Sequence, residues 1–458
     1  MNTVKHISAI ILGFCVFLTA CGGPSAEVRA DIARMIAAGQ HREAAEYIES
    51  KKSSAYGKSN AVLFHLDKGA ALHYGGRYRQ SDQELDLAET RMEELYTTSV
   101  TKAAGRFLVN DTTEDYRGRP QDHAILNVMR SLNYIFLGKP AESAVEARKI
   151  AEFLARFAAA AEAKFSYQDD AFAHYLSGLV FAASAYRDAA KARAEPDAMP
   201  VWQDARVSFA RARETYGHYT GAYGVPTPTI DLPKLTAGQG ELVVIHYNGP
   251  PPRLVSRATQ IEWNNAMVAV RETGSDTDGT VDRAVAAGLS GNAITFALPA
   301  FEQSPFRATR SVVRVAGGEA ETELVEDVSA ILAKQIEEEA NTTRARAIAR
   351  ATIKYLVAKL AEEATRQALK NTQYGGVASL FVGIGGRALA SATEQADARS
   401  WASLPAQIRV ARLRLPAGKY DVTVDLLSQE GAPIGRRVIR NATIGDRRMT
   451  FCSLHSAL

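Results

Sequence analysis

The stretch Gly69-Ala70-Ala71-Leu72-His73-Tyr74-Gly75-Gly76-Arg77-Tyr78 decides the fold that we expect for the N-terminal half. A tetratricopeptide unit has about 34 residues in two antiparallel helices, with small residues where the helices cross and a glycine at the turn. Gly69 provides a small residue in the first helix and Gly76 provides the turn, and Leu85 and Ala88 follow at packing positions of a second helix. The stretch therefore predicts a helix-turn-helix repeat.

Three further candidate repeats flank this one. Their turn and packing residues are Gly39 with Ala44, Ala45 and Ile48; Gly138 with Ala144, Ala147 and Ile150; and Tyr175, Gly178 and Phe181 with Ala205, Phe209 and Ala212. Residues 25–220 are therefore predicted to form a helical solenoid of tetratricopeptide type, in which each repeat contacts its neighbours. An unrelated helical bundle stays open as the alternative. The polar segment Thr97 to His123 is expected to project as an insertion.

The first residues predict export and lipid attachment. Lys5 precedes the apolar run Ile7 to Phe17, which is shorter than the about 20 residues that span a bilayer. The stretch Leu18-Thr19-Ala20-Cys21 looks like a bacterial lipobox, in which the cysteine thiol is diacylated before cleavage. We expect residues 1–20 to be a signal peptide and residues 21–24 to be a lipidated tether that begins at Cys21.

The residue after the lipobox cysteine bears on localisation. Gly22 is not the aspartate that resembles the inner-membrane retention signal of enterobacterial lipoproteins. The sequence therefore favours the periplasmic face of the outer membrane, with the protein held to that membrane through its N-terminal lipid.

Composition describes an ordinary folded chain. Of the 458 residues, 46% are hydrophobic and 23% are charged, which suffices to bury a core. The net charge of +3 gives no electrostatic reason to expect a nucleic acid partner. Once Cys15 leaves with the signal peptide and Cys21 is lipidated, Cys452 is the one cysteine left. An intramolecular disulfide and a multi-cysteine zinc site are therefore excluded.

The distal half changes character after a Pro/Gly-rich linker at residues 221–240. The rest, residues 241–458, is predicted to be a mixed domain. Strands are expected within residues 241–300 and 406–453, helices within residues 321–370, and a glycine-rich segment at residues 374–392. We expect two helices, with a break at Asn341-Thr342-Thr343. The fold class is therefore α+β multidomain, in which a tetratricopeptide-like α-solenoid precedes a mixed domain with long helices and a C-terminal antiparallel β-sandwich or meander.

Several motifs together carry a resemblance. They are the lipobox, Asp67-Lys68-Gly69, Leu95-Tyr96-Thr97, Asn110-Asp111, Gly240-Glu241-Leu242-Val243-Val244 and the run from Thr393 to Pro405. With these motifs the chain resembles a family of uncharacterised bacterial tetratricopeptide-repeat lipoproteins, over nearly the whole mature length. The resemblance implies a fold and an address, and no reaction. It makes Asp397, Arg399 and Trp401 a candidate distal signature, whose role is either structural or functional.

The chain contains no complete catalytic motif. Neither GxSxG nor HExxH occurs, and Asp169-Asp170 fit a helix cap better than an acid/base pair. The run Gly383 to Ala388 fits GxGxxA but lacks the βαβ unit that must follow this motif in a nucleotide-binding fold, so we expect no bound nucleotide. We also expect no other cofactor and no metal. In the repeat alignment His73 and Tyr74 face the groove. We take them as candidate contacts to a partner, with packing between helices as the alternative.

These observations predict a non-enzymatic, membrane-anchored lipoprotein that acts as an interaction scaffold in the cell envelope. Its repeat groove would bind an envelope protein of unknown identity. Two alternatives stay open. The protein could be an envelope enzyme or glycan-binding protein with its site in the distal domain, or a membrane-associated oligomeric component that uses residues 374–392.

Overall fold

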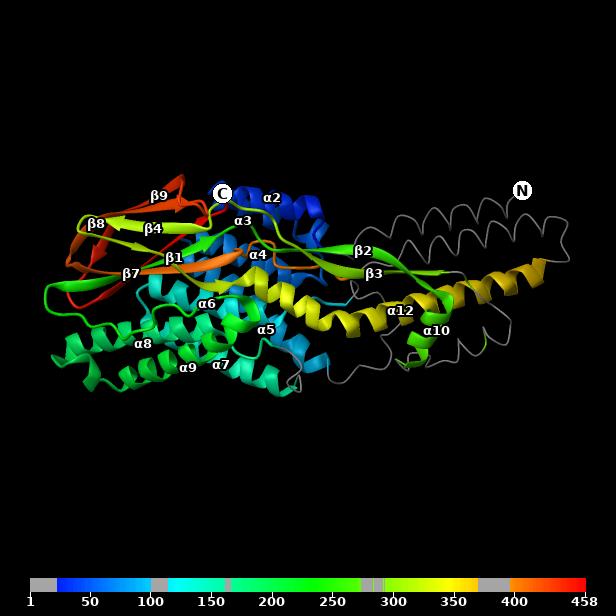
Figure 1. Ribbon diagram of the computed structural model, residues 1–458, viewed down its shortest axis with the longest axis horizontal. Coiled ribbons are helices and arrows are strands. Elements are labelled where there is room, and N and C mark those ends of the chain that lie inside the picture. Colours follow the sequence, from blue (N-terminus) through cyan, green and yellow to red (C-terminus); the bar gives the residue numbers. More distant parts are fainter. Residues whose placement is uncertain are drawn as a thin grey trace.

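The computed structural model describes residues 23–99, 114–160, 166–272, 283, 291, 293–369 and 396–458. In this part of the chain the fold is mixed α+β, with helices first and strands mostly later (Figure 1). The predicted signal peptide, Cys21, and the glycine-rich segment 374–392 with its GxGxxA run lie outside the described residues.

The N-terminal half forms a layer of paired helices. These are α2 (Ala26–Ala37), α3 (His41–Ser50), α4 (Ala61–Tyr74), α5 (Tyr78–Ser99), α6 (Pro120–Phe136), α7 (Pro140–Ala160), α8 (Ala171–Ala192) and α9 (Pro200–Tyr223), with short helical turns at η1 (Lys52–Tyr56) and η3 (Pro196–Ala198). The predicted turn residues Gly39, Gly76 and Gly138 all lie between paired helices, with φ of 75°, 70° and 72°. Glycine adopts this left-handed backbone without steric cost, and so ends each first helix.

Small residues let the paired helices approach closely, as predicted. A Cβ atom at Gly69 of α4 would lie 2.6 Å from Cδ2 of Leu85 on α5. A Cβ atom at Gly178 of α8 would lie equally close to the ring of Phe209 on α9. Ala88 is buried at the same α4–α5 crossing. Two helix pairs therefore pack in the same way. A glycine in the first helix leaves space for a large side chain of the second helix.

The strands of the described residues form two four-stranded sheets and one two-stranded ribbon. They are β1 (Gln239–Asn248), β2 (Arg253–Glu262), β3 (Ala293–Glu302), β4 (Arg310–Val315), β5 (Gly318–Glu321), β6 (Glu323–Asp327), β7 (Gln407–Pro416), β8 (Gly418–Leu427), β9 (Pro433–Ile444) and β10 (Met449–Ser456). The inner sheet has the order β10-β1-β7-β6, the outer sheet has the order β5-β4-β8-β9, and β2 pairs with β3. Strands β7 and β8 lie in different sheets, so the turn at Ala417 crosses from one sheet to the other. The distal strands form a sandwich, as one of the two expected arrangements.

The expectation of purely antiparallel strands is wrong for the inner sheet. β1 pairs antiparallel with β7 but parallel with β10. A parallel pair needs a crossover, and here nearly the whole distal half of the chain separates the two strands. Sequence signals for hairpins act over short distances, so they could not indicate this pairing.

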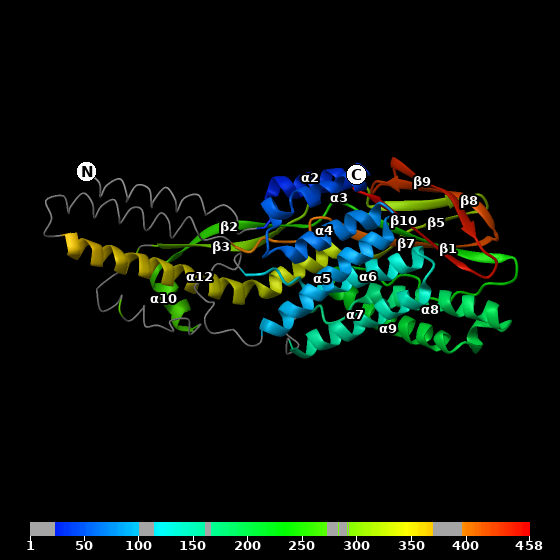
Figure 2. The same ribbon diagram turned by 180° about the vertical axis from the view of Figure 1, so that it is seen from behind.

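Two hydrophobic cores lie on opposite faces of the inner sheet. Along β1, Val243 and Ile245 face the helical layer, and Leu242 and Val244 face the outer sheet, because successive side chains of a strand alternate. The body thus has three layers, with helices, inner sheet and outer sheet in that order (Figures 1 and 2). The helical layer and the inner sheet share one continuous core across the predicted linker.

An arm projects from this body. It consists of the β2–β3 ribbon, α10 (Trp263–Glu272) and the distal part of α12 (Val328–Leu369), and both ribbon views show it extending beyond the helical layer and the sheets. The arm has small apolar clusters of its own, in which Val270 of α10 packs with Ile353 and Leu356 of α12, and Phe296 of β3 packs with Ile348.

Helix α12 corrects the prediction of two helices in residues 321–370. It is one helix of 42 residues, and β5 and β6 occupy the chain up to Asp327. The run Asn341-Thr342-Thr343 continues the helix because each residue costs only tenths of a kcal/mol in a helix that contains neither proline nor glycine. Packing of the next turns against α10 and β3 offsets that cost. Helix α10 likewise interrupts the region 241–300 in which only strands were expected.

The predicted insertion at Thr97 to His123 is also corrected in part. Helix α5 continues to Ser99 and α6 begins at Pro120. The described residues between them do not project, because Tyr116 is buried and its amide donates to the carbonyl of Ser59 at 2.7 Å. Residues 100–113 lie outside the described part of the chain.

Candidate functional site

His73 and Tyr74, the candidate groove residues, lie between the helical layer and the inner sheet. His73 Nδ1 is 2.7 Å from Asn133 Oδ1 of α6, and His73 Nε2 is 2.9 Å from the hydroxyl of Tyr247 on β1. The Tyr74 ring contacts the rings of Tyr247 and His455 of the inner sheet at inclined angles, with ring centroids 5.1 and 4.8 Å away. The inner sheet packs against both residues, so neither lies in an open groove, and their role as contacts to an external partner stays a prediction. Burial lowers the pKa of His73 to about 4, so it is neutral at this interface.

The distal signature is packed against the helical layer. Trp401 is buried and its Nε1 donates to Ser403 Oγ at 2.7 Å. The amide and hydroxyl of Ser403 donate to Asp67 Oδ1 of α4, and the hydroxyl of Tyr56 donates to Asp67 Oδ2 at 2.7 Å. The hydroxyl of Tyr74 donates to the Ser403 carbonyl at 3.0 Å. The structure thus joins two motifs of the resemblance, Asp67-Lys68-Gly69 and the run to Pro405, in one buried network.

Arg399 is the second anchor of that segment. Its Nε and Nη2 donate to the two carboxylate oxygens of Asp397 at 2.8 and 2.7 Å. Its Nη1 donates to Asn60 Oδ1 at 3.1 Å and to the carbonyl of Glu114 at 2.7 Å. A planar guanidinium can donate to several acceptors at once. The buried side chain of Arg399 thereby connects three segments that are distant in sequence.

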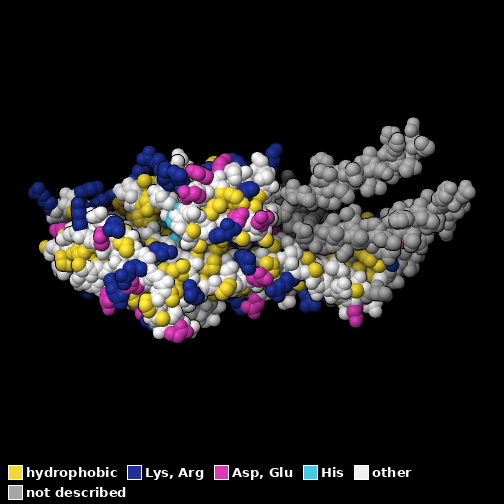
Figure 3. Space-filling model, turned by 90° about the horizontal axis from the view of Figure 1, so that it is seen from above, with side chains coloured by type: hydrophobic (Ala, Val, Ile, Leu, Met, Phe, Trp, Pro, Cys, Tyr) yellow, Lys and Arg dark blue, Asp and Glu magenta, His cyan; other side chains and the backbone are white. Residues whose placement is uncertain are grey.

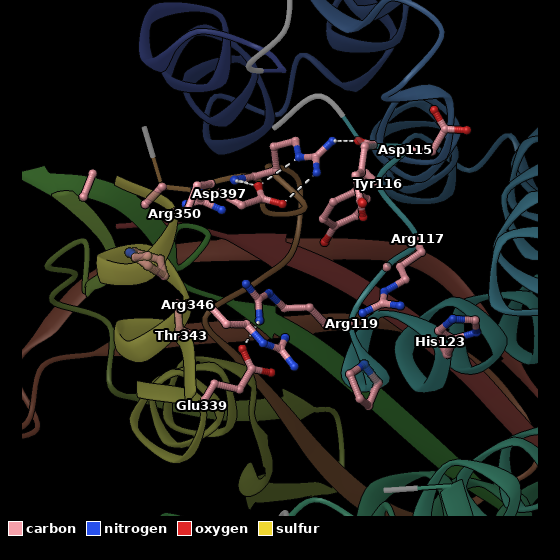
Figure 4. A pocket seen from close by; sticks show the side chains of 18 of the residues that line it. Asp115, Tyr116, Arg117, Arg119, His123, Glu339, Thr343, Arg346, Arg350 and Asp397 are labelled. Atoms are coloured by element: carbon pink, nitrogen blue, oxygen red, sulfur yellow. Dashed lines mark hydrogen bonds and ion pairs between the residues drawn. The ribbon is translucent and has the colours of Figure 1, made fainter. Parts of the chain in front are cut away.

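A pocket of about 440 Å³ opens beside Arg399, where the body meets the arm (Figure 4). The segment before α6 forms one wall, α12 forms the opposite wall, and residues 396–399 close a third side. Its ionisable lining residues are Arg117, Arg119, Arg346, Arg350, Arg399, Glu114, Asp115, Glu339, Asp397 and His123. A volume of this size is typical of ligand sites.

The charges of the pocket lining are unevenly compensated. Asp397 is paired with Arg399, and Glu339 is 3.3 Å from Arg119. Asp115 is turned outward and pairs with Arg91 at 2.6 Å. Two further arginines, Arg117 and Arg346, are exposed and form no ion pair with any residue that the structure describes.

Part of the remaining lining is apolar or neutral. His123 stacks on Phe153 with ring centroids 3.9 Å apart and planes 9° apart. Burial lowers the pKa of His123 to about 3, so its ring carries no charge at neutral pH. Arg119 adds an unused donor, because its Nε is buried and no described group accepts its hydrogen. The arrangement favours an anion bound beside an apolar wall.

The N-terminal end of the described chain lies against the same site. A Cβ atom at Gly23 would be 3.1 Å from Cγ of Arg399 and 3.4 Å from Asn60 Oδ1. Arg29 of α2 donates to the carbonyl of Ala398 at 2.8 Å, which fixes α2 beside residues 396–399. Gly23 and α2 therefore lie next to this pocket, which we call the arginine pocket.

Sequence reasoning missed the pocket arginines. Arg117 and Arg119 precede α6, whereas Arg346 and Arg350 lie one helical turn apart on α12, more than 200 residues later. The one local signal is that spacing of four residues, which places both side chains on one face of a helix. Such a pair is common on solvated helices, so it could not identify a site.

The other sequence predictions about chemistry concern single residues. Asp170 caps α8, since its carboxylate accepts from the amide of Ala173 at 2.6 Å, as predicted. Cys452 is a free cysteine packed at the edge of the outer core, and burial raises its pKa to about 11. Among the described residues, no group of three or more His, Cys, Asp or Glu side chains could hold a metal ion. No described helix is long and apolar enough to cross a membrane.

Comparisons with protein-family models, with curated proteins and with solved structures find no match for this chain. Its function is therefore inferred from its own geometry.

Proposed function

We propose that this protein is a non-enzymatic scaffold of the bacterial cell envelope, anchored through a lipid on Cys21 to the periplasmic face of the outer membrane. The lipobox supports the anchor. Helix pairs at the predicted turns, with the Gly69–Leu85 and Gly178–Phe209 contacts in common, support a solenoid of tetratricopeptide type. In such a solenoid, the first helices of the repeats line the groove.

The groove of this solenoid holds a partner within the same chain. His73 of α4, the first helix of its pair, reaches Tyr247 of β1. The sheet also contacts α9, the second helix of the α8–α9 pair, because the hydroxyl of Tyr216 donates to the carbonyl of Val325 on β6 at 2.8 Å. An external peptide could enter this face only by displacing the inner sheet and exposing the shared core. The groove of the body is thus filled by the inner sheet, and an envelope partner binds to a surface outside this groove.

The projecting arm is the observation that carries the scaffold proposal. One continuous helix, α12, connects the main core to the separate apolar clusters of the arm. Hydrophobic side chains are visible on the arm's surface in Figure 3. Two of its large hydrophobic side chains are about half exposed, Val268 at 50% and Val357 at 46%. A long helix that projects beyond the body suits a protein-binding element better than an active site, because active sites are typically concave pockets.

Site-specific photo-crosslinking tests this proposal. A photoreactive amino acid at Val268 or Val357, in cells that express the full chain, is expected to crosslink to one defined envelope protein. The matched controls are Val207 and Val438, which lie on the body and are exposed at 46% and 48%. Equal crosslinking from all four positions, or crosslinking from the body alone, would overturn the assignment of partner binding to the arm.

A further inference from the structure

The arginine pocket between α6, α12 and residues 396–399 lies beside the point where the chain leaves the body toward Cys21. Gly23 packs against Arg399, whose guanidinium lines the pocket. Two residues of chain span at most about 7 Å. A lipid on Cys21 would therefore hold this side of the body at the membrane surface, with the pocket close to the headgroups.

The lining of the pocket selects for an anion. Arg117 and Arg346 approach it from opposite walls, from the segment before α6 and from α12 (Figure 4). Their charges are not used in ion pairs with the described residues, whereas the acidic side chains Glu339 and Asp397 are already paired. Two guanidinium groups facing one space are favourable only when an anion or solvent lies between them.

The hydrogen-bond donors and the apolar residues of the lining indicate which kind of anion fits the pocket. Guanidinium groups bind phosphate oxygens through two parallel hydrogen bonds, and the unused Nε of Arg119 offers a further donor in the same lining. Phe153 and Pro299 supply an apolar wall beside these donors. A phosphate ester with an apolar or uncharged substituent fits both features.

We propose that this pocket binds the phosphate group of an anionic ligand, and that its source is an anionic phospholipid headgroup of the anchoring membrane. The phosphate site follows from the pocket alone and does not depend on the scaffold role of the arm. Only the choice of a lipid source rests on the proposed anchor. Headgroup binding would fix the orientation of the body, and so of the arm, on the membrane.

The test uses the full-length, processed protein in neutral detergent and follows its thermal unfolding midpoint. The probes are short-chain dihexanoyl-phosphatidylglycerol, the zwitterionic dihexanoyl-phosphatidylcholine and inorganic phosphate, at matched ionic strength. We expect a saturable rise of the midpoint with phosphatidylglycerol and a much smaller effect of the other two. The double variant Arg117→Gln/Arg346→Gln is expected to weaken the apparent affinity at least tenfold.

Arg344→Gln is the matched control. Arg344 is exposed on α12 two residues before Arg346 and does not line the pocket. It should keep the wild-type affinity, and all variants should share the wild-type midpoint without probe because the replaced side chains are exposed. Equal affinity for inorganic phosphate and phosphatidylglycerol would overturn the lipid source and leave a site for a free phosphate compound. No saturable shift, or the same affinity in the double variant, would overturn the site itself. None of these outcomes depends on what the arm crosslinks.

Discussion

The backbone amide and the hydroxyl of Ser403 both donate to Oδ1 of Asp67, at 3.0 and 2.9 Å, across 336 residues of sequence. The hydroxyl of Tyr56 donates to the other carboxylate oxygen. One buried carboxylate of the helical layer therefore holds the segment that leads into β7. This contact and the His73–Tyr247 contact both join the helical layer to the distal half of the chain.

Removing this carboxylate should destabilise the whole body. Asp67→Ala leaves the buried donors of Ser403 and Tyr56 without an acceptor, and each such group costs about 1 to 3 kcal/mol. We expect a loss of about 3 kcal/mol or more in the free energy of unfolding, measured by urea titration. Glu49→Ala is the control, because Glu49 is half exposed and pairs with Lys68 at the surface. Similar losses for both variants would show that Asp67 is not a special contact.

The same carboxylate should make stability depend on pH. Burial raises the pKa of Asp67 from 3.8 to about 6, so the folded protein holds a proton there that the unfolded chain releases near pH 4. The protonated Asp67 side chain therefore contributes most to the free energy of unfolding below about pH 4. This contribution is lost as the pH rises from 4 through 6. Relative to Asp67→Asn, the wild type should lose up to about 3 kcal/mol between pH 4 and pH 7. Urea titrations at several pH values measure this difference, and parallel pH profiles for the two proteins would contradict it.

The close crossing of α8 and α9 predicts opposite effects for two equal substitutions. Gly178→Ala places a methyl group 2.6 Å from the Phe209 ring and should cost about 1 to 3 kcal/mol by overpacking. Gly217→Ala, in α9, meets nothing within 4 Å and should stabilise by about 0.5 to 1 kcal/mol, because alanine favours a helix over glycine. Thermal unfolding compares the two. Stabilisation by both would place Phe209 away from Gly178.

The sequence could predict these helix pairs because their signals are local. A turn glycine, a small residue and a large apolar residue recur within one repeat, so Gly69 and Leu85 could be named beforehand. Strand β1 was equally clear as an apolar run. Strand β2 lies in the region 241–300 where strands were expected, but most of its residues are exposed, which leaves no apolar alternation to set its bounds.

The sites could not be predicted in the same way. The pocket draws on residues 114–123, 339–350 and 396–399, which only the tertiary fold brings together. The repeat alignment placed His73 and Tyr74 in the groove, but it contained no information about what fills that groove. The occupant, the inner sheet, lies more than 150 residues further along the chain.

The lipobox predicts the outcome of a cysteine substitution. Cys21→Ser should abolish labelling of the protein with radioactive palmitate and should release it from the membrane fraction, because the acyl chains hold it there. Cys452→Ser is the matched control and should keep both properties, since Cys452 is a free cysteine in the body. If the Cys21 variant is still labelled and still sediments with membranes, the anchor is elsewhere.

The strength of the interface between the helical layer and the inner sheet can be measured at one hydrogen bond. His73 joins Asn133 of α6 to Tyr247 of β1 through its two ring nitrogens, at 2.7 and 2.9 Å, and burial keeps the ring neutral. The variants His73→Ala and Tyr247→Phe, alone and combined, form a double-mutant cycle. Removal of the Tyr247 hydroxyl should cost less once His73 is gone, with a coupling energy of about 1 kcal/mol in urea unfolding.

The control for this cycle is Tyr420→Phe, a tyrosine of the outer sheet whose hydroxyl donates to the carbonyl of Pro416. Its effect should add to that of His73→Ala within about 0.5 kcal/mol, because the two residues do not touch. If His73 served an external partner in an open groove, His73→Ala would abolish partner binding with little effect on unfolding, and the cycle with Tyr247 would be additive as well. A coupling confined to Tyr247 would instead mean that the inner sheet packs against this face of the helical layer in solution, which leaves the arm as the surface proposed for a partner.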